Sequence, residues 1–248
     1  MVKGLEKFKK YFEEYKDQYV LIGGAACDIA FENSNVSFRA TRDLDVVLIL
    51  EALTPEFGDR FWSFVSDGKY RNKSTNNEKP QFYRFDKPEN DEYPKMIELF
   101  CRNEYKLHEM GGITPIHISD EISSLSAILL NDDYYKVLIK GKTVVDNLSI
   151  LRPEYLILLK ARAYLDLRSR KENGEGVNSD DIKKHKKDVL RIAAELVIEN
   201  VYNLPETVKS DIDTFICLLE EEPFDNNSLK EYGLSNSEVV NVLKEKFK

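Results

Sequence analysis

The sequence predicts an α+β protein in which a strand-rich N-terminal part precedes an all-helical C-terminal part. Short apolar runs bounded by turn residues predict strands in the first half, and apolar residues at helical spacing fill the second half. For a chain of 248 residues this change of character predicts two domains, residues 1–150 and residues 151–248.

The N-terminal part begins with a predicted amphipathic helix over residues 3–17, because Leu5, Phe8, Phe12 and Tyr15 recur at helical spacing. The expected strands cover residues 19–22, 43–50, 81–85, 95–102, 113–119 and 123–130, the last of which is ambiguous with helix. The expected helices start at residue 25, cover residues 56–66, and run from a cap at Asn131 to Gly141.

The C-terminal part is predicted to contain helices alone. Pro153 suits the first turn of a long helix that runs to about Arg170, since proline needs no hydrogen bond to its nitrogen there. The later helices are expected to begin at a cap formed by Ser179 or Asp180, at Pro205, and at a cap formed by Ser235 or Asn236.

The charge of the chain is acidic overall and uneven along its length. A net charge of −8 argues against a protein that coats nucleic acid without specificity. Between Lys160 and Arg191, however, ten basic and six acidic residues give a net charge of +4. This segment is either a solvated helical face, the usual meaning of a charge run, or a local positive field for an anion.

Several classes of protein are excluded by simple features of the sequence. The longest uncharged apolar stretch near the start, residues 19–27, is too short to span a bilayer, and the charged N-terminus does not resemble a signal peptide. The three cysteines and three histidines are too scattered for a disulfide framework or a zinc site, and we expect the cysteines to be reduced core residues. We therefore expect a cytoplasmic protein with no membrane partner.

Two aspartates, Asp43 and Asp45, stand one residue apart at the front of an apolar predicted strand. Because side chains alternate along a strand, both carboxylates face the same side, a few ångströms apart. Two like charges at this separation raise the free energy unless a cation lies between them. Mg²⁺ is usually held by one or two carboxylates together with substrate phosphates, so the pair is a candidate Mg²⁺ site. The alternative is an aspartate pair that closes a turn.

A third carboxylate, Glu98, lies in a predicted strand that is otherwise apolar on both faces. Burying it without a partner would cost several kcal/mol or keep it protonated. A metal ion shared with the aspartate pair would remove this cost. The alternatives are an exposed position at the sheet edge or an ion pair with Arg84 or Lys95.

Two further features suit the phosphates of a nucleotide. Gly23 and Gly24 lie between a predicted strand and a predicted helix, where glycine permits close backbone approach and the helix N-terminus offers N–H groups. Lys160 lies within an apolar run, so its ammonium either reaches out to water or points at an anion. The alternative for the glycine pair is an ordinary turn.

Together these motifs resemble the nucleotidyltransferase superfamily of DNA polymerase β. The resemblance rests on the order strand, Gly23-Gly24, helix, followed by the alternating Asp-hydrophobic run at residues 43–46 and one carboxylate, Glu98, on a later strand. It implies a mixed β-sheet flanked by helices, followed by a C-terminal helical part. It also implies Mg²⁺-dependent transfer of a nucleoside monophosphate from an NTP to an acceptor hydroxyl.

Within this superfamily the chain is similar to the minimal, AbiEii-like bacterial group. The phrase Phe-Arg-Ala-Thr-Arg-Asp-Leu-Asp at residues 38–45 and the Pro-Glu helix start that leads to Lys160 carry this resemblance. In that group the lysine binds nucleotide phosphate, and a following basic-Asp element completes the site. The nearest match here is the run Lys-His-Lys-Lys-Asp, from which Lys184 and Asp188 are carried over.

The resemblance implies roles for nine residues. The catalytic and metal-binding residues are Asp43, Asp45 and Glu98, which would hold one or two Mg²⁺ ions. The nucleotide-binding residues are Gly23, Gly24, Thr41, Lys160, Lys184 and Asp188. Glu98 either completes a second metal site or acts as the base that deprotonates the acceptor hydroxyl, and the alternative for Thr41 is an ordinary strand residue.

The sequence leaves the acceptor open. Toxin-like relatives imply an RNA 3′ end and an antitoxin partner, and the segment of charge +4 would suit RNA. A small molecule such as an aminoglycoside and a protein hydroxyl are the alternatives. A further alternative is a non-catalytic interaction module that kept the fold, although an acidic cluster without metal would destabilise such a protein.

Overall fold

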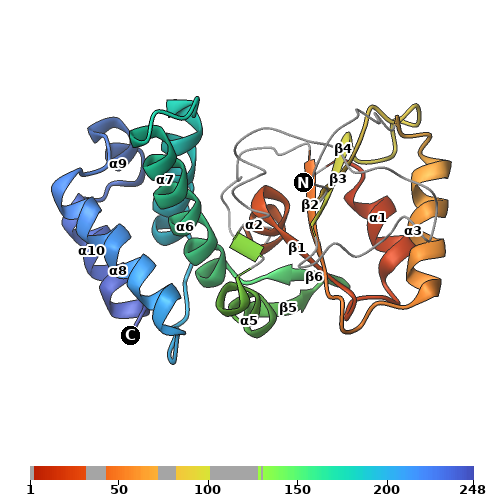
Figure 1. Cartoon of the computed structure of the whole chain (residues 1–248), viewed down its shortest axis with the longest axis horizontal. Coiled ribbons are helices and arrows are strands. Elements are labelled where there is room, and N and C mark those ends of the chain that lie inside the picture. The colour runs from red at the N-terminus through yellow and green to blue at the C-terminus, as the bar shows by residue number, and fades with distance from the viewer. Residues whose placement is uncertain (1–2, 32–42, 72–81, 101–127, 130) are drawn as a thin grey trace. The chain divides into compact units, whose positions relative to one another are not determined.

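The computed structural model describes residues 3–31, 43–71, 82–100, 128–129 and 131–248 (Figure 1). Contacts within the chain divide it into two compact units. The first, here called the sheet unit, comprises Met1–Ile118 and Lys142–Arg152. The second, the helical unit, comprises Ser119–Gly141 and Pro153–Lys248.

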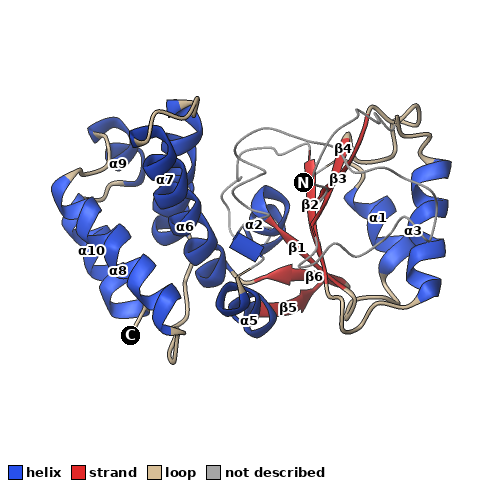
Figure 2. Cartoon of the chain, viewed as in Figure 1, coloured by secondary structure: helices blue, strands red, loops and turns tan. Residues whose placement is uncertain are grey.

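The described part of the sheet unit contains six strands and three helices (Figure 2). The strands are β1 (Tyr19–Ile22), β2 (Asp43–Leu48), β3 (Phe82–Asp86), β4 (Met96–Phe100), β5 (Lys142–Val145) and β6 (Leu148–Leu151). The helices are α1 (Leu5–Phe12), α2 (Gly23–Phe31) and α3 (Pro55–Asp67). The strands form one mixed sheet in the order β3-β4-β2-β1-β6-β5, in which β2–β4 and β1–β6 are parallel.

Aromatic side chains form much of the core between α1, α3 and the sheet. Phe8 and Phe12 of α1 lie fully buried, with ring centroids 5.8 and 5.5 Å from that of Phe64 on α3. Each such ring contributes about 2–3 kcal/mol through burial, so these contacts hold both helices against the unit. Strand β1 is apolar along its whole length, and β2 is apolar from Val46 onward, as the position of both strands inside the sheet requires.

The hairpin of β5 and β6 was not expected from the sequence. Its turn is made by Asp146 and Asn147, whose φ angles are 46° and 62°. Positive φ at both central positions is typical of a type I′ turn, which Asn and Asp tolerate better than most residues. An Asp-Asn pair between two short β-branched or apolar runs was therefore a signal for this hairpin.

The helical unit contains α5 (Asp132–Gly141), α6 (Pro153–Glu172), α7 (Ser179–Glu195), α8 (Glu206–Glu221), α9 (Asn226–Tyr232) and α10 (Asn236–Lys246). Helix α6 is central, since α5, α7 and α8 all pack against it. The side chain of Asn131 caps α5 by accepting hydrogen bonds from the amides of Asp133 and Tyr134, as expected from the sequence. Ser235 caps α10 in a capping box with Glu238.

The predicted α+β class is confirmed, with a mixed sheet flanked by helices and followed by C-terminal helices. Helix α1 is shorter than predicted, and α2 already begins at Gly23. The cap of α7 is Asn178, which accepts a hydrogen bond from the amide of Asp180, so the predicted caps Ser179 and Asp180 were wrong. Short α9 was not expected, and Cys217 is exposed where a core position was predicted.

Two of the predicted strands fall largely outside the described residues. These are residues 113–119 and residues 123–130, and within the second only Ile128 and Leu129 are described, both helical. In the part of the chain that the structure describes, no helix has the length and apolar character needed to cross a membrane.

Candidate active site

A row of paired positions crosses four neighbouring strands of the sheet. Arg84 on β3 is opposite Glu98 on β4, and Glu98 is opposite Asp45 on β2. Asp45 in turn is opposite Ile22, the last residue of β1. Side chains at paired positions of adjacent strands point to the same face, and Asp43, two residues before Asp45, shares that face. The fold thus gathers three carboxylates and one guanidinium, here called the carboxylate group.

Glu98 is the most deeply buried member of the carboxylate group, with 6% of its surface exposed. Burial raises its pKa above the usual 4.5, and the negative charge of Asp43 adds to this effect. The positive charge and hydrogen bonds of Arg84 and a hydrogen bond with Asp45 lower the pKa, but the net direction is upward. Glu98 is therefore in contact with Asp45 and within electrostatic reach of Asp43.

The ion pair with Arg84, one of the alternatives for Glu98, is present. Both Nε and Nη2 of Arg84 donate to Oε1 of Glu98, at 2.9 and 2.5 Å. The Arg84 side chain is 28% exposed and that of Glu98 only 8%. The third carboxylate is thus held from the edge strand by a cation that the protein itself supplies.

Gly23 makes the closest backbone approach to the aspartates. Its φ is 63°, and a Cβ atom built on it would lie 2.0 Å from Oδ2 of Asp45. A side chain here would displace the carboxylate of Asp45 and would also be strained in the left-handed region, so glycine suits this position best. Gly23 and Gly24 are the first two residues of α2, so the N–H groups of its first turn begin beside Asp45.

The donor set of the carboxylate group fits a hard divalent cation. Its ligand atoms are all carboxylate oxygens, which Mg²⁺ prefers. Asp45 and Glu98 share a hydrogen bond beside the negative charge of Asp43, and Arg84 supplies one positive charge to these three carboxyl groups, so a further cation or a bound proton would offset the remaining negative charge. Among the described residues, however, no three His, Cys, Asp or Glu side chains are grouped so that all could bind one ion as they stand.

A second set of predicted residues meets within the helical unit. Nζ of Lys160 on α6 lies 2.7 Å from Oδ2 of Asp188 on α7, and the two side chains are 14% and 16% exposed. Lys160 therefore does not extend into water. We call Lys160, Lys184, His185 and Asp188 the lysine group.

His185 belongs to the lysine group but was not among the predicted site residues. It is 6% exposed, and burial lowers its pKa well below the usual 6.5. The positive charges of Lys160 and Lys184 lower the pKa further. His185 is thus neutral at pH 7, one helical turn before Asp188, and this spacing in the sequence was the signal that could have included it. Thr41, the remaining predicted residue, lies outside the described residues.

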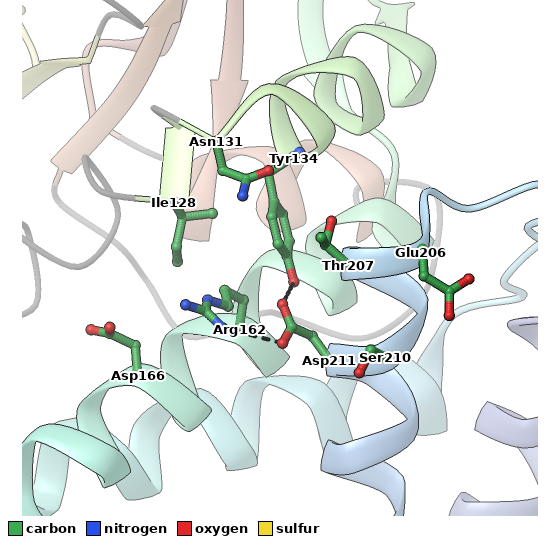
Figure 3. A pocket seen from close by; sticks show the side chains of 9 residues that line it. All are labelled: Ile128, Asn131, Tyr134, Arg162, Asp166, Glu206, Thr207, Ser210 and Asp211. Carbon is green, nitrogen blue, oxygen red and sulfur yellow. Dashed lines mark hydrogen bonds and ion pairs between the residues drawn. The ribbon is translucent and has the colours of Figure 1, made fainter.

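The helical unit also holds a pocket of about 510 Å³ that the sequence did not indicate (Figure 3). Asp211 lies between Tyr134, whose hydroxyl donates to Oδ2 at 2.8 Å, and Arg162, whose Nη1 donates to Oδ1 at 3.1 Å. The other lining residues are Ile128, Asn131, Asp166, Glu206, Thr207 and Ser210. None of the predicted site residues lines this pocket.

Comparison with known proteins finds five similar chains among the solved structures, including the two proteins that follow. No protein-family model and no curated protein sequence matches the chain. An antigenic nucleotidyltransferase-like protein from Paracoccidioides brasiliensis is 12% identical, with a TM-score of 0.46 over 98% of this chain and 94% of that chain. JHP933 from Helicobacter pylori is 13% identical, with a TM-score of 0.38 over 97% of this chain and 92% of that chain.

Proposed function

We propose that the protein is a Mg²⁺-dependent nucleotidyltransferase, which moves a nucleoside monophosphate from an NTP to an acceptor hydroxyl. The observation that supports this most is the contact of Asp45 with Glu98, with Asp43 on the same face and the start of α2 against Asp45. Carboxylates beside a helix N-terminus suit a metal ion together with the phosphates it neutralises.

Asp43 and Asp45 are the residues that would hold the metal. When bound, Mg²⁺ would offset the charge of the triphosphate and stabilise the attacking and leaving oxygens of an in-line displacement. The first amides of α2, starting at Gly23, would donate to phosphate oxygens, since helix N-termini leave these N–H groups without partners inside the helix.

Glu98 is suited to take the proton of the acceptor hydroxyl. A carboxylate with a raised pKa is a stronger base, which favours proton transfer as the bond to phosphorus forms. Arg84 donates to Oε1, so Oε2 is the oxygen that would take up the proton. The acceptor oxygen bonds to the α-phosphorus, the bond from that phosphorus to the bridging oxygen breaks, and pyrophosphate leaves.

The AbiEii-like resemblance assigns Lys160 and Lys184 to nucleotide phosphate, with Asp188 orienting the lysine. The ion pair of Lys160 with Asp188 supports this role, because it fixes a lysine ammonium that would otherwise be mobile. His185, which stays neutral near both lysines, adds no further positive charge to the lysine group. An RNA 3′ end as acceptor and an antitoxin as partner belong to the same proposal.

Transfer of labelled nucleotide tests the proposal. The full chain is incubated with Mg²⁺, each α-³²P-NTP in turn, and an RNA mixture, an aminoglycoside set or a protein extract. We expect label in one acceptor class, and a loss of at least about a hundredfold in Asp43→Asn and Asp45→Asn. Asp59→Asn, at an exposed position on α3, is the matched control and should keep the parent rate.

Calorimetric titration with NTP and Mg²⁺ provides the second arm of this test. If both aspartate variants bind NTP·Mg²⁺ as tightly as the parent, the mechanism is wrong. Tight nucleotide binding by the parent without transfer to any acceptor would favour the non-catalytic interaction module.

A further inference from the structure

Arg84 is a cation built into the carboxylate group. It lies on β3, the edge strand of the sheet, at the position paired with Glu98. Two of its N–H groups converge on the same oxygen, Oε1, at 2.9 and 2.5 Å. A guanidinium keeps its charge at every pH that a folded protein experiences, so this positive charge is permanent.

This fixed charge lies against Glu98, the carboxylate that a second metal ion would use. Two-metal sites place their ions about 3.5–4 Å apart and use a shared set of carboxylates. An ion that bound Glu98 would therefore meet Arg84 at short range, beside a glutamate of which only 6% is exposed, so water would screen the two charges weakly. The repulsion between a divalent ion and the guanidinium would disfavour its binding.

We propose that Arg84 takes the place of a second metal ion, so that the site binds one divalent cation at Asp43 and Asp45 while the guanidinium neutralises Glu98. This inference rests on the proposed function and deepens it. Glu98 was given two roles above, as a ligand of a second metal ion or as the base, and this proposal favours the base.

Arg84 acts in this proposal as a positioning residue for Glu98. Because both of its hydrogen bonds go to Oε1, the carboxyl plane is fixed and Oε2 keeps one orientation. Asp45, paired with Glu98 across β2 and β4, is the carboxylate that would share the metal with Asp43. In this arrangement the two aspartates on β2 would bind the metal ion, and Arg84 on β3 neutralises Glu98 on β4.

The number of bound Mn²⁺ ions tests this inference without any measurement of activity. The free Mn²⁺ signal in electron paramagnetic resonance is followed as the whole 248-residue chain is titrated with Mn²⁺ alone. We expect a single ion on the parent and on Arg84→Lys, which keeps the positive charge. We expect a second ion on Arg84→Ala, and a return to a single ion on Arg84→Ala/Glu98→Gln, which removes the ligand that the second ion would use.

The outcomes separate this inference from the proposed function. Two ions on the parent, or one on Arg84→Ala, would overturn the role of Arg84 and leave the nucleotidyltransferase proposal standing. Absence of Mn²⁺ from the parent, or unchanged binding in Asp43→Asn/Asp45→Asn, would overturn both. Circular dichroism of each variant shows whether it is folded, and Arg84→Lys against Arg84→Met provides a second comparison if Arg84→Ala unfolds.

Discussion

The ammonium of Lys160 lies 2.7 Å from the carboxylate of Asp188, in a pair of side chains that are both less than one-fifth exposed. Removing one partner of such a pair leaves a buried charge without compensation. We expect Asp188→Ala to lower the free energy of unfolding by about 2–4 kcal/mol in urea titrations. Lys160→Met/Asp188→Leu should recover most of this loss but not nucleotide binding.

The control for this prediction is the exposed pair of Lys209 and Asp213 on α8, at 2.8 Å with side chains 33% and 52% exposed. Asp213→Ala should change the free energy of unfolding by no more than about 0.5 kcal/mol. If the apolar double variant at Lys160 and Asp188 binds ATP as the parent does, Lys160 has no role at the phosphates.

Gly23→Ala should disturb the carboxylate group directly. The new methyl group would overlap Oδ2 of Asp45, and the left-handed backbone would add about 1 kcal/mol of strain. Gly233→Ala is the matched control, since Gly233 has a φ of 64° and a methyl group there would meet no atom within 4 Å. We expect similar backbone strain in both variants, but weaker Mn²⁺ binding only in Gly23→Ala. Equal Mn²⁺ affinity in the two variants would contradict the contact with Asp45.

Glu98 should make the protein less stable as pH rises. Burial raises the pKa of Glu98 in the folded protein above the usual 4.5, so the folded state holds this proton more tightly than the unfolded chain. Stability from this group is therefore complete below pH 4.5 and is lost as pH rises through the folded pKa. Relative to the parent, Glu98→Gln should gain stability as the pH rises above 4.5, in urea titrations with a chelator. A difference that does not change with pH would contradict this assignment.

Asp211 should stabilise the helical unit through the hydroxyl of Tyr134. Tyr134 is 2% exposed, and its hydroxyl donates to Asp211 at 2.8 Å. Asp211→Ala leaves this buried donor without its acceptor and should lower the free energy of unfolding by about 1–3 kcal/mol. In a double-mutant cycle, Tyr134→Phe should cost less in the Asp211→Ala background than in the parent. Ser210→Ala, in the same pocket, should stay within about 0.5 kcal/mol of the parent.

The elements that carry the carboxylates could be predicted from local pattern. The apolar run after Asp45 and the alternation of strand side chains were enough to place β2 and to put both aspartates on one face. The expected position of β4 rested on the same kind of run, and Asn131 indicated the start of α5. These are properties of short segments, which can be predicted from the sequence alone.

The contacts between these elements could not be predicted from local sequence pattern. The pairing of Asp45 with Glu98 and of Glu98 with Arg84 is a matter of register between strands far apart in sequence. The free-energy cost of burying a carboxylate indicated that Glu98 needs a partner. It did not distinguish a metal ion from Arg84 as that partner. The contact between Gly23 and Asp45 depends on a backbone angle that glycine permits and does not require.

The parallel pairing of Leu21 with Ile150 has a consequence for how the chain folds as the ribosome makes it. The two residues are about 130 positions apart, so β1 emerges long before β6 can cover its edge. Until the β5–β6 hairpin is synthesised, β1 is an open sheet edge, which is a template for association with other chains. The nascent protein should therefore be prone to aggregate until translation passes residue 152, and chaperones should bind it most in that interval.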